Sequence, residues 1–230
     1  MVSQPSGQDT LSSFPFLTSG EFESACHAFL TRIHAANRSM VGWSSIRFQT
    51  TNQTLRISLC FNDRRNCQHC DFTHSVYAEN TLDAQLEVCE EDPEALTRTP
   101  DTRETLQADY EIIHSPTYQV PVLYFVLRRS ELPLGIVDVY NYLVPDQYKS
   151  NIQTVGIMGG ISFGYHPGSG TPAFFVHPCN TADAMKDIAD GHGISPEAYL
   201  IIWLGLVGNC VRLQLPKELF ATAGIPDFNA

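Results

Sequence analysis

The segment from Ser195 to Val207 constrains the fold most, because in this 230-residue chain it predicts a helix that is apolar on almost every side. Ser195, Pro196 and Glu197 form a strong helix start: a capping hydroxyl, a proline at the first helical position and an acid beside the positive end of the helix dipole. The apolar run is far shorter than the roughly 20 residues that a membrane span requires. We therefore expect this helix to be buried within a globular domain.

Patterns that precede this helix predict another helix and then strands. Thr18 and Glu21 stand in capping-box spacing and apolar residues follow at helical intervals, so we expect an amphipathic helix over about 20–36. Four β-prone segments come next, the first two as a hairpin. They are 43–50, 55–61, 110–114 and 118–127. Strands grouped before helices predict an α+β fold with an antiparallel sheet of about four strands.

Several stretches carry weaker signals. Between 63 and 109 acidic residues dominate and prolines interrupt any periodicity, so we expect a long acidic surface insertion, partly helical around 82–88. Residues 133–145 fit either a short helix or an irregular packed segment. The glycine-rich stretch 154–172 predicts a shaped loop. A short strand over 211–215 and a terminal helical turn are expected at the end of the chain.

Size and composition indicate one globular domain. With 43% hydrophobic and 17% charged residues the composition is ordinary for a folded protein. We assign 18–230 to a single domain and 1–17, rich in Ser, Gln and Pro, to a flexible N-terminal segment. The net charge of −11 disfavours nucleic acid as a partner. The first ten residues do not resemble a secretory signal and the seven cysteines cannot form a complete disulfide set, so we expect a cytoplasmic protein.

Cys179 is the residue best suited to nucleophilic chemistry. A short strand over 173–176 leads into His177, Pro178 and Cys179, and Asn180 is positioned to cap a following helix. A thiolate is favoured near a helix N-terminus and beside a histidine. In an extended segment His177 lies on the same face as Cys179. From these residues alone a structural role for Cys179 stays open, because a cysteine after a strand is more often a small buried hydrophobe.

Four stretches, spread over the half of the chain that begins at Asp109, resemble the autophagy-related E2-like conjugating enzymes. They are Ser115–Phe125, Tyr165–Pro172 with its His166-Pro167 pair, Phe174–Thr181 around Cys179, and Tyr199–Pro216. The run Tyr-Gln-Val-Pro-Val-Leu-Tyr-Phe and the compact length resemble the branch of that family that joins autophagy protein twelve to autophagy protein five.

The resemblance implies a UBC-like fold and a thioester relay without metal or cofactor. Cys179 would receive the ubiquitin-like autophagy protein twelve from the E1-like activating enzyme, autophagy protein seven, and transfer it to a lysine of autophagy protein five. The matching positions make His177, Pro178, Asn180 and His166 the supporting residues of this site.

The residue that stabilises the oxyanion stays open. Ordinary E2 enzymes carry an asparagine after His-Pro, whereas here Gly168 follows His166-Pro167. Asn180, Asn141 and His177 are the candidates, although each asparagine fits a cap or a turn equally well.

Two other classes of function compete with the conjugating enzyme. One is a non-catalytic interaction module of UBC-like shape in which Cys179 is buried packing; the other is a cysteine hydrolase, for which no base and orienting acid can be located. A zinc site is disfavoured. Cys67 and Cys70, with Cys60 and His74 nearby, have zinc-knuckle spacing, but the second ligand pair of a structural site is absent.

Overall fold

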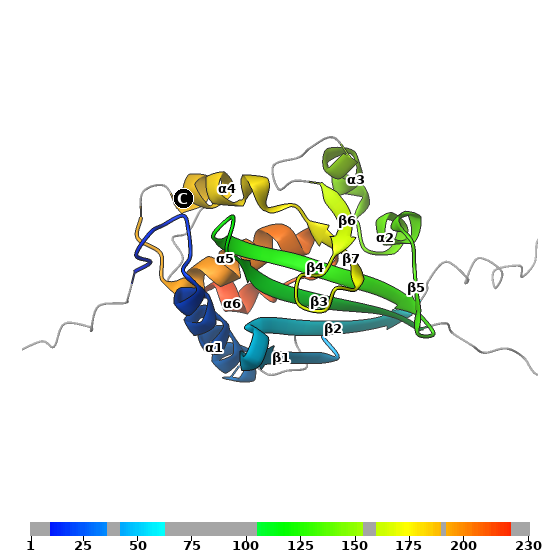
Figure 1. The fold of residues 1–230 in the computed structure, drawn as a ribbon, viewed down its shortest axis with the longest axis horizontal. Helices are drawn as coiled ribbons and strands as arrows, with labels where there is room; N and C mark the ends of the chain where they lie inside the picture. Colours follow the sequence, from blue (N-terminus) through cyan, green and yellow to red (C-terminus); the bar gives the residue numbers. More distant parts are fainter. Residues whose placement is uncertain (1–9, 36–41, 63–104, 154–159, 190–191, 222–230) are drawn as a thin grey trace, which may run out of the picture.

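A seven-stranded antiparallel sheet forms the centre of the molecule (Figure 1). The computed structural model describes residues 10–35, 42–62, 105–153, 160–189 and 192–221. The strand order is β1-β2-β3-β4-β7-β6, with β5 paired to β4. The strands are β1 (Ser45–Gln49), β2 (Thr54–Asn62), β3 (Thr105–Ser115), β4 (Val120–Arg129), β5 (Leu132–Pro133), β6 (Ile161–Tyr165) and β7 (Pro172–Val176).

The helices surround this sheet, and α5 lies behind it in the view of Figure 1. They are α1 (Ser19–Ala35), α2 (Ile136–Tyr142), α3 (Asp146–Gln153), α4 (Thr181–Ala189), α5 (Pro196–Asn209) and α6 (Lys217–Ala221), with two 3-10 turns, η2 (Thr50–Asn52) and η4 (Pro178–Asn180). α1 and α5 pack against each other, and α4 contacts α5. None of the helices in the described ranges combines the length and the apolar composition that crossing a membrane would take.

The hydrophobic core lies between α1, α5 and the inner face of the sheet. Alternate residues of β3 from Leu106 to Ile112 are buried, as expected for a strand with one face on a core. Trp203 of α5 is 1% exposed and belongs to the same cluster. The Tyr110 side chain is fully buried in the core, and its phenolic hydroxyl donates a hydrogen bond of 2.7 Å to the carbonyl of Val211. The expected burial of α5 is therefore confirmed.

The capping box predicted at the first helix is present. The Thr18 hydroxyl accepts a hydrogen bond from the Glu21 amide at 3.2 Å, and the Glu21 carboxylate accepts one from the Thr18 amide at 2.8 Å. The carboxylate also accepts from the Ser12 amide at 2.7 Å. These contacts fix the start of α1, whose apolar stripe is buried in the core.

Two further predictions from the sequence are confirmed. The first two strands form an antiparallel hairpin joined through η2. At the start of α5 the Ser195 hydroxyl accepts a hydrogen bond from the Ala198 amide at 3.2 Å, and Pro196 is the first helical residue. The open choice over 133–145 is settled as a short helix, α2.

The sheet is larger than the four strands predicted, and its third strand begins earlier. β3 starts at Thr105, so 105–109 belong to the sheet and not to the acidic insertion expected over 63–109; the remainder of that insertion, with its helix at 82–88, lies outside the described residues. The expected loop over 154–172 contains the strand β6. Gly164 of β6 allows the Phe175 ring to approach closely, because a Cβ added at position 164 would lie 3.2 Å from a carbon of that ring.

The prediction of a strand over 211–215 is wrong. The Leu213 amide instead donates to the Gly208 carbonyl at 2.8 Å, and Arg212 has φ of +60°, so the chain turns directly after α5. An added Cβ at Gly208 would lie 2.2 Å from the Leu213 carbonyl oxygen, which explains why glycine stands there. The terminal helical turn is confirmed as α6.

The N-terminal segment requires a correction over its second half. Leu11 and Leu17 are buried in the core, and their amides donate to the carbonyls of Ile194 and Gln119 at 3.0 and 2.8 Å. Residues 10–17 therefore pack on the domain instead of forming part of a flexible segment over 1–17. Residues 1–9 lie outside the described residues.

Candidate active site

Cys179 lies in the middle of η4, between the end of β7 and the start of α4. Its side chain is exposed, whereas Cys26 and Cys210 are buried. Burial raises the pKa of the Cys26 thiol, and the nearby Glu23 carboxylate raises it further. Burial also raises the pKa of Cys210. The interpretation of Cys179 as buried packing is thus contradicted, and the thiol is accessible to a reaction partner.

His177 holds the backbone at Cys179. Its Nδ1 atom accepts a hydrogen bond of 3.2 Å from the Cys179 amide, so His177 caps η4 and Pro178 occupies the first position of the turn. Asn180, the expected cap of the next helix, is the last residue of η4 and directly precedes Thr181, the first residue of α4. Because Nδ1 is an acceptor here, a proton on the neutral imidazole resides on Nε2. Pro178 is buried and anchors the turn, whereas the side chain of Cys179 is exposed.

A row of aromatic rings runs from His177 along the outer face of the sheet. Tyr118, in the turn between β3 and β4, meets the His177 ring edge-on with 5.7 Å between centroids. From His177 the row continues to Phe175 at 6.1 Å, to Tyr124 at 5.3 Å and to His166 at 5.0 Å. No local sequence pattern marks Tyr118 as a residue of this site. The register of β4 against β7, which pairs Tyr124 with Phe175, places the β3–β4 turn at the end of β7, where Tyr118 contacts His177.

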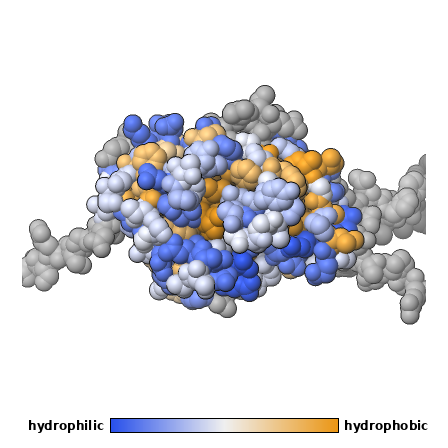
Figure 2. Space-filling view, viewed as in Figure 1, coloured by the Kyte–Doolittle hydropathy of each residue, from blue (hydrophilic) through white to orange (hydrophobic). Residues whose placement is uncertain are grey.

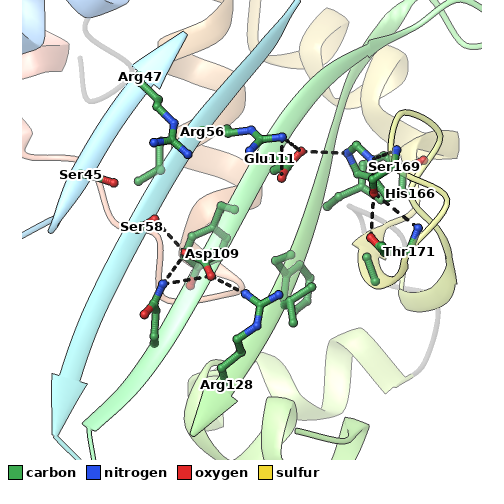
Figure 3. A pocket seen from close by; sticks show the side chains of 17 residues that line it. Ser45, Arg47, Arg56, Ser58, Asp109, Glu111, Arg128, His166, Ser169 and Thr171 are labelled. Carbon is green, nitrogen blue, oxygen red and sulfur yellow. Dashed lines mark hydrogen bonds and ion pairs between the residues drawn. The ribbon is translucent and has the colours of Figure 1, made fainter. Parts of the chain in front are cut away.

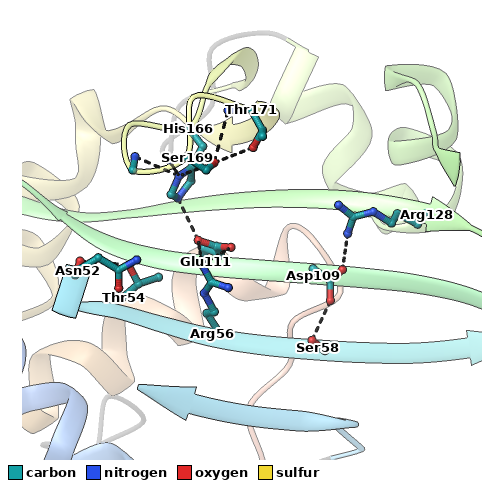
Figure 4. Close-up of polar contacts among 11 residues, drawn as sticks. Asn52, Thr54, Arg56, Ser58, Asp109, Glu111, Arg128, His166, Ser169 and Thr171 are labelled. Carbon is teal, nitrogen blue, oxygen red and sulfur yellow. Dashed lines mark hydrogen bonds and ion pairs between the residues drawn. The ribbon is translucent and has the colours of Figure 1, made fainter. Parts of the chain in front are cut away.

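His166 supports a loop on the sheet rather than the sulfur of Cys179. It is 5% exposed, and its Nδ1 accepts from the amides of Gly168 and Ser169, both at 3.2 Å (Figure 4). Its Nε2 lies 3.1 Å from a carboxylate oxygen of Glu111, within ion-pair distance although not in good hydrogen-bond geometry. The strand β7 separates this loop from η4. His166 therefore shapes the β6–β7 connection, and its expected role beside the nucleophile is not seen.

The three residues considered for the oxyanion are not gathered around the thiol. Asn180 is adjacent to Cys179 in η4, and the Nδ1 atom of His177 is engaged by the Cys179 amide. Asn141 lies on the exposed side of α2, which Figure 1 shows on the other side of the β6–β7 hairpin from α4. Of the three, only Asn180 and His177 lie in the same turn as the nucleophile.

No group of three or more potential metal ligands occurs among the described residues. Cys60 is exposed on β2, and its sulfur lies 3.7 Å from the Ser44 hydroxyl. Cys67, Cys70 and His74 lie outside the described residues.

The site around Cys179 consists of an exposed thiol, the capping imidazole of His177 and the row of aromatic rings that begins at His177. This arrangement suits attack of the thiol on a carbonyl carbon.

Comparisons with known proteins agree with the resemblance seen in the sequence. The protein named ubiquitin-like-conjugating enzyme ATG10 from Gibberella zeae is 44% identical over 144 residues, covering 61% of this chain and 58% of that protein. The Homo sapiens protein of the same name is 33% identical over 143 residues, covering 60% and 61%. The aligned part of the chain thus spans less than two thirds of the length of either relative.

The architecture also has a counterpart among solved structures. "Crystal structure of Autophagic E2, Atg10" superposes with a TM-score of 0.50 over 84% of this chain and 94% of that chain, at 12% identity, which shows the likeness of the fold alone. The E2-like α+β fold expected from the sequence is therefore confirmed. A family model described as "Autophagocytosis associated protein, active-site domain" matches residues 21–218, which include the whole sheet and Cys179. The chain therefore belongs to the autophagocytosis-associated family defined by that active-site domain.

Proposed function

We propose that this protein is an E2-like conjugating enzyme that carries a ubiquitin-like protein as a thioester on Cys179. The Cys179 thiolate attacks the thioester carbonyl on an E1-like enzyme, a new carbon–sulfur bond forms, and the E1 thiolate leaves. The amine of a target lysine then attacks the same carbonyl. A carbon–nitrogen bond forms, the Cys179 thiolate is released, and the proton lost by the amine passes to solvent or to a nearby base.

The exposed Cys179 on η4, inside the family's active-site domain, is the observation that carries this proposal. A reaction between three proteins needs a nucleophile at the surface, because a protein-bound thioester cannot enter a closed cavity. The capped turn fixes the direction of the sulfur, which lowers the entropic cost of reaching the reactive geometry. The relatives named ubiquitin-like-conjugating enzymes support the same reaction class.

The branch of the family suggests the partners. We assign autophagy protein seven as the E1-like donor, autophagy protein twelve as the ubiquitin-like cargo and autophagy protein five as the acceptor, all meeting in the cytoplasm. The Tyr118–Phe125 segment, which carried the resemblance to this branch, contains the end of the β3–β4 turn and the first part of β4, and its Tyr118 contacts His177.

Incubation with the E1-like enzyme, ATP and the ubiquitin-like protein tests the proposal. The wild type should form an adduct that thiol reductant cleaves, and Cys179→Ser should form a reductant-resistant ester or no adduct. Cys60→Ser is the matched control, because Cys60 is also a free, exposed cysteine. A reductant-sensitive adduct that persists on Cys179→Ser and disappears on Cys60→Ser would reverse the assignment.

A further inference from the structure

Two arginines face each other across the first hairpin. The register pairs Arg47 of β1 with Arg56 of β2, and Arg56 with Glu111 of β3, so the three side chains form one row on the outer face. Like charges directly opposite each other in an antiparallel pair are destabilising. A row with two cations and one anion has a net positive charge, which a second negative group would neutralise.

Among the described residues, one carboxylate, that of Glu111, belongs to this row. Glu111 lies 3.2 Å from the Arg56 guanidinium and also faces His166, so it is shared between two partners. The Nε atom of Arg56 is buried without a hydrogen-bond partner. Arg47 is exposed and, among the described residues, makes neither a hydrogen bond nor an ion pair. By contrast Arg128 has its own carboxylate, that of Asp109 at 2.6 Å.

The row lies in a hollow of about 480 Å³ (Figure 3). The hydroxyls of Ser45 and Ser58 line it next to the two arginines, and the Arg47 side chain points toward Arg56. Ser58 already donates to Asp109 at 2.8 Å, whereas no partner of Ser45 is found within the described ranges. One guanidinium and one hydroxyl on β1 thus remain as donors for an incoming group.

A second, more apolar hollow adjoins the first. It has a volume of about 630 Å³, shares Tyr124 and His166 with the first hollow, and is lined by Ile113, Val122 and Pro167 among others. Ile113 stands two residues and two strands away from Arg47, a separation of about 12 Å, or three to four residues of extended chain. A guest that fills both hollows is therefore anionic at one end and apolar at the other.

We propose that this two-part groove on the outer face of the sheet binds an acidic segment of a protein partner. A carboxylate of the segment lies against Arg47 and the Ser45 hydroxyl, and an apolar side chain three or four residues away enters the hollow beside Ile113. A polypeptide fits better than a phosphate polymer or an anionic lipid surface, because the second hollow requires an apolar side chain at a fixed distance from the carboxylate. The proposal is independent of the thioester on Cys179.

A labelled synthetic peptide in which two glutamates precede a leucine by three residues serves as the probe, with fluorescence anisotropy as the readout. Arg47→Glu should weaken binding by at least about fivefold, and raised ionic strength should weaken binding to the wild type. Lys217→Glu, which makes the same charge change at an exposed site on α6, should bind within about twofold of the wild type. Replacing the glutamates by glutamine, or the leucine by serine, should each weaken binding.

Four results would overturn the proposal. The first two are equal binding of the peptide by Arg47→Glu and the wild type, and a loss of binding in Lys217→Glu as large as that in Arg47→Glu. The third is displacement of the peptide by inorganic phosphate at a similar molar affinity. The fourth is a wild-type protein whose hollow is filled by a second copy of this chain. The last is recognised by sedimentation velocity, as a dimer that Arg47→Glu dissociates. Thioester formation on Cys179 should be unchanged in Arg47→Glu, so failure of this inference and failure of the proposed function are distinguishable.

Discussion

On the inner face of β3, Leu106, Tyr110 and Ile112 are buried among apolar side chains, whereas on its outer face Asp109 and Glu111 hold charged partners. Both faces belong to one strand, and their side chains alternate along it. The inner face excludes water over the whole length of the strand. The outer face carries an ordered polar network that, among the described residues, is not covered by an apolar layer.

The two faces of β3 have different roles. Apolar burial on the inner side supplies most of the free energy of folding, since it scales with the area removed from water. Polar pairs on the outer side contribute little net stability, but they hold specific groups at specific positions. Figure 2 shows strongly hydrophilic surface in the lower part of the molecule, where Figure 1 places β1 and β2, and apolar surface toward α2.

The largest stability effect should follow from shortening an inner-face leucine. Leu204→Ala should lower the free energy of unfolding by about 2–5 kcal/mol, because Leu204 is fully buried on α5. Leu132→Ala makes the same change at a side chain that is 70% exposed and should cost less than about 0.5 kcal/mol. Urea titration of both variants measures the difference. Equal losses would contradict the division between buried and open surfaces.

A smaller loss should follow on the outer face. Glu111→Gln should lower the free energy of unfolding by about 1–2 kcal/mol, because it removes the negative charge that faces Arg56 at 3.2 Å and His166 at 3.1 Å. Glu131→Gln, at an exposed position, should stay within about 0.5 kcal/mol of the wild type. Thermal unfolding followed by circular dichroism compares the two. A loss as large as that of Leu204→Ala would place the outer network on a par with the core.

The start of α1 should give the fold a pH dependence at low pH. Burial acts to raise the pKa of Glu21, but hydrogen bonds from Ser12 and Thr18 outweigh it and lower this pKa from 4.5 to about 2. A lowered pKa in the folded state means that the stabilisation is present above pH 4.5 and is lost as the pH falls toward 2.

Glu21→Gln should therefore cost about 1 kcal/mol at neutral pH, the usual cost of losing a capping side chain. Compared with the wild type, its free energy of unfolding should decline less between pH 5 and pH 2. Urea titrations at a series of pH values provide the measurement. Parallel curves for the two proteins would show that the capping carboxylate does not titrate in this range.

The smallest effect should be a gain. Arg47→Gln removes one of two opposed cations from the outer row, so it should raise the free energy of unfolding by a few tenths of a kcal/mol. Lys217→Gln removes a charge at an exposed position on α6 and should leave stability unchanged. Added salt should shrink the gain, because it screens the repulsion between the arginines. A stability loss in Arg47→Gln would show that Arg47 already has a stabilising role in the fold.

The features that sequence analysis predicted well depend on local patterns. The capping pair Thr18 and Glu21, the Ser195-Pro196 start of α5 and the first hairpin each act within a few residues. The position of Cys179 after a strand and before a helix was predicted for the same reason.

The features that were missed depend on contacts between distant segments. β6 is a strand only because it pairs with β7, and its Gly164 makes room for the Phe175 ring. The contact of Tyr118 with His177 follows from the pairing of β4 with β7, which no local pattern specifies. His166 was placed with the nucleophile by its motif, yet its partner Glu111 is 55 positions away in the sequence, and only the folded sheet brings them together.

The attachment point of the ubiquitin-like protein shows whether Cys179 is the residue that carries it. Cys179→Ser can be loaded by the E1-like enzyme, digested with trypsin and analysed by mass spectrometry for the branched peptide that carries the cargo's C-terminal glycine. We predict an ester at residue 179 or no adduct at all, with Cys26, Cys60 and Cys210 unmodified in either case. A thioester on another cysteine of that variant, at wild-type yield, would contradict this prediction.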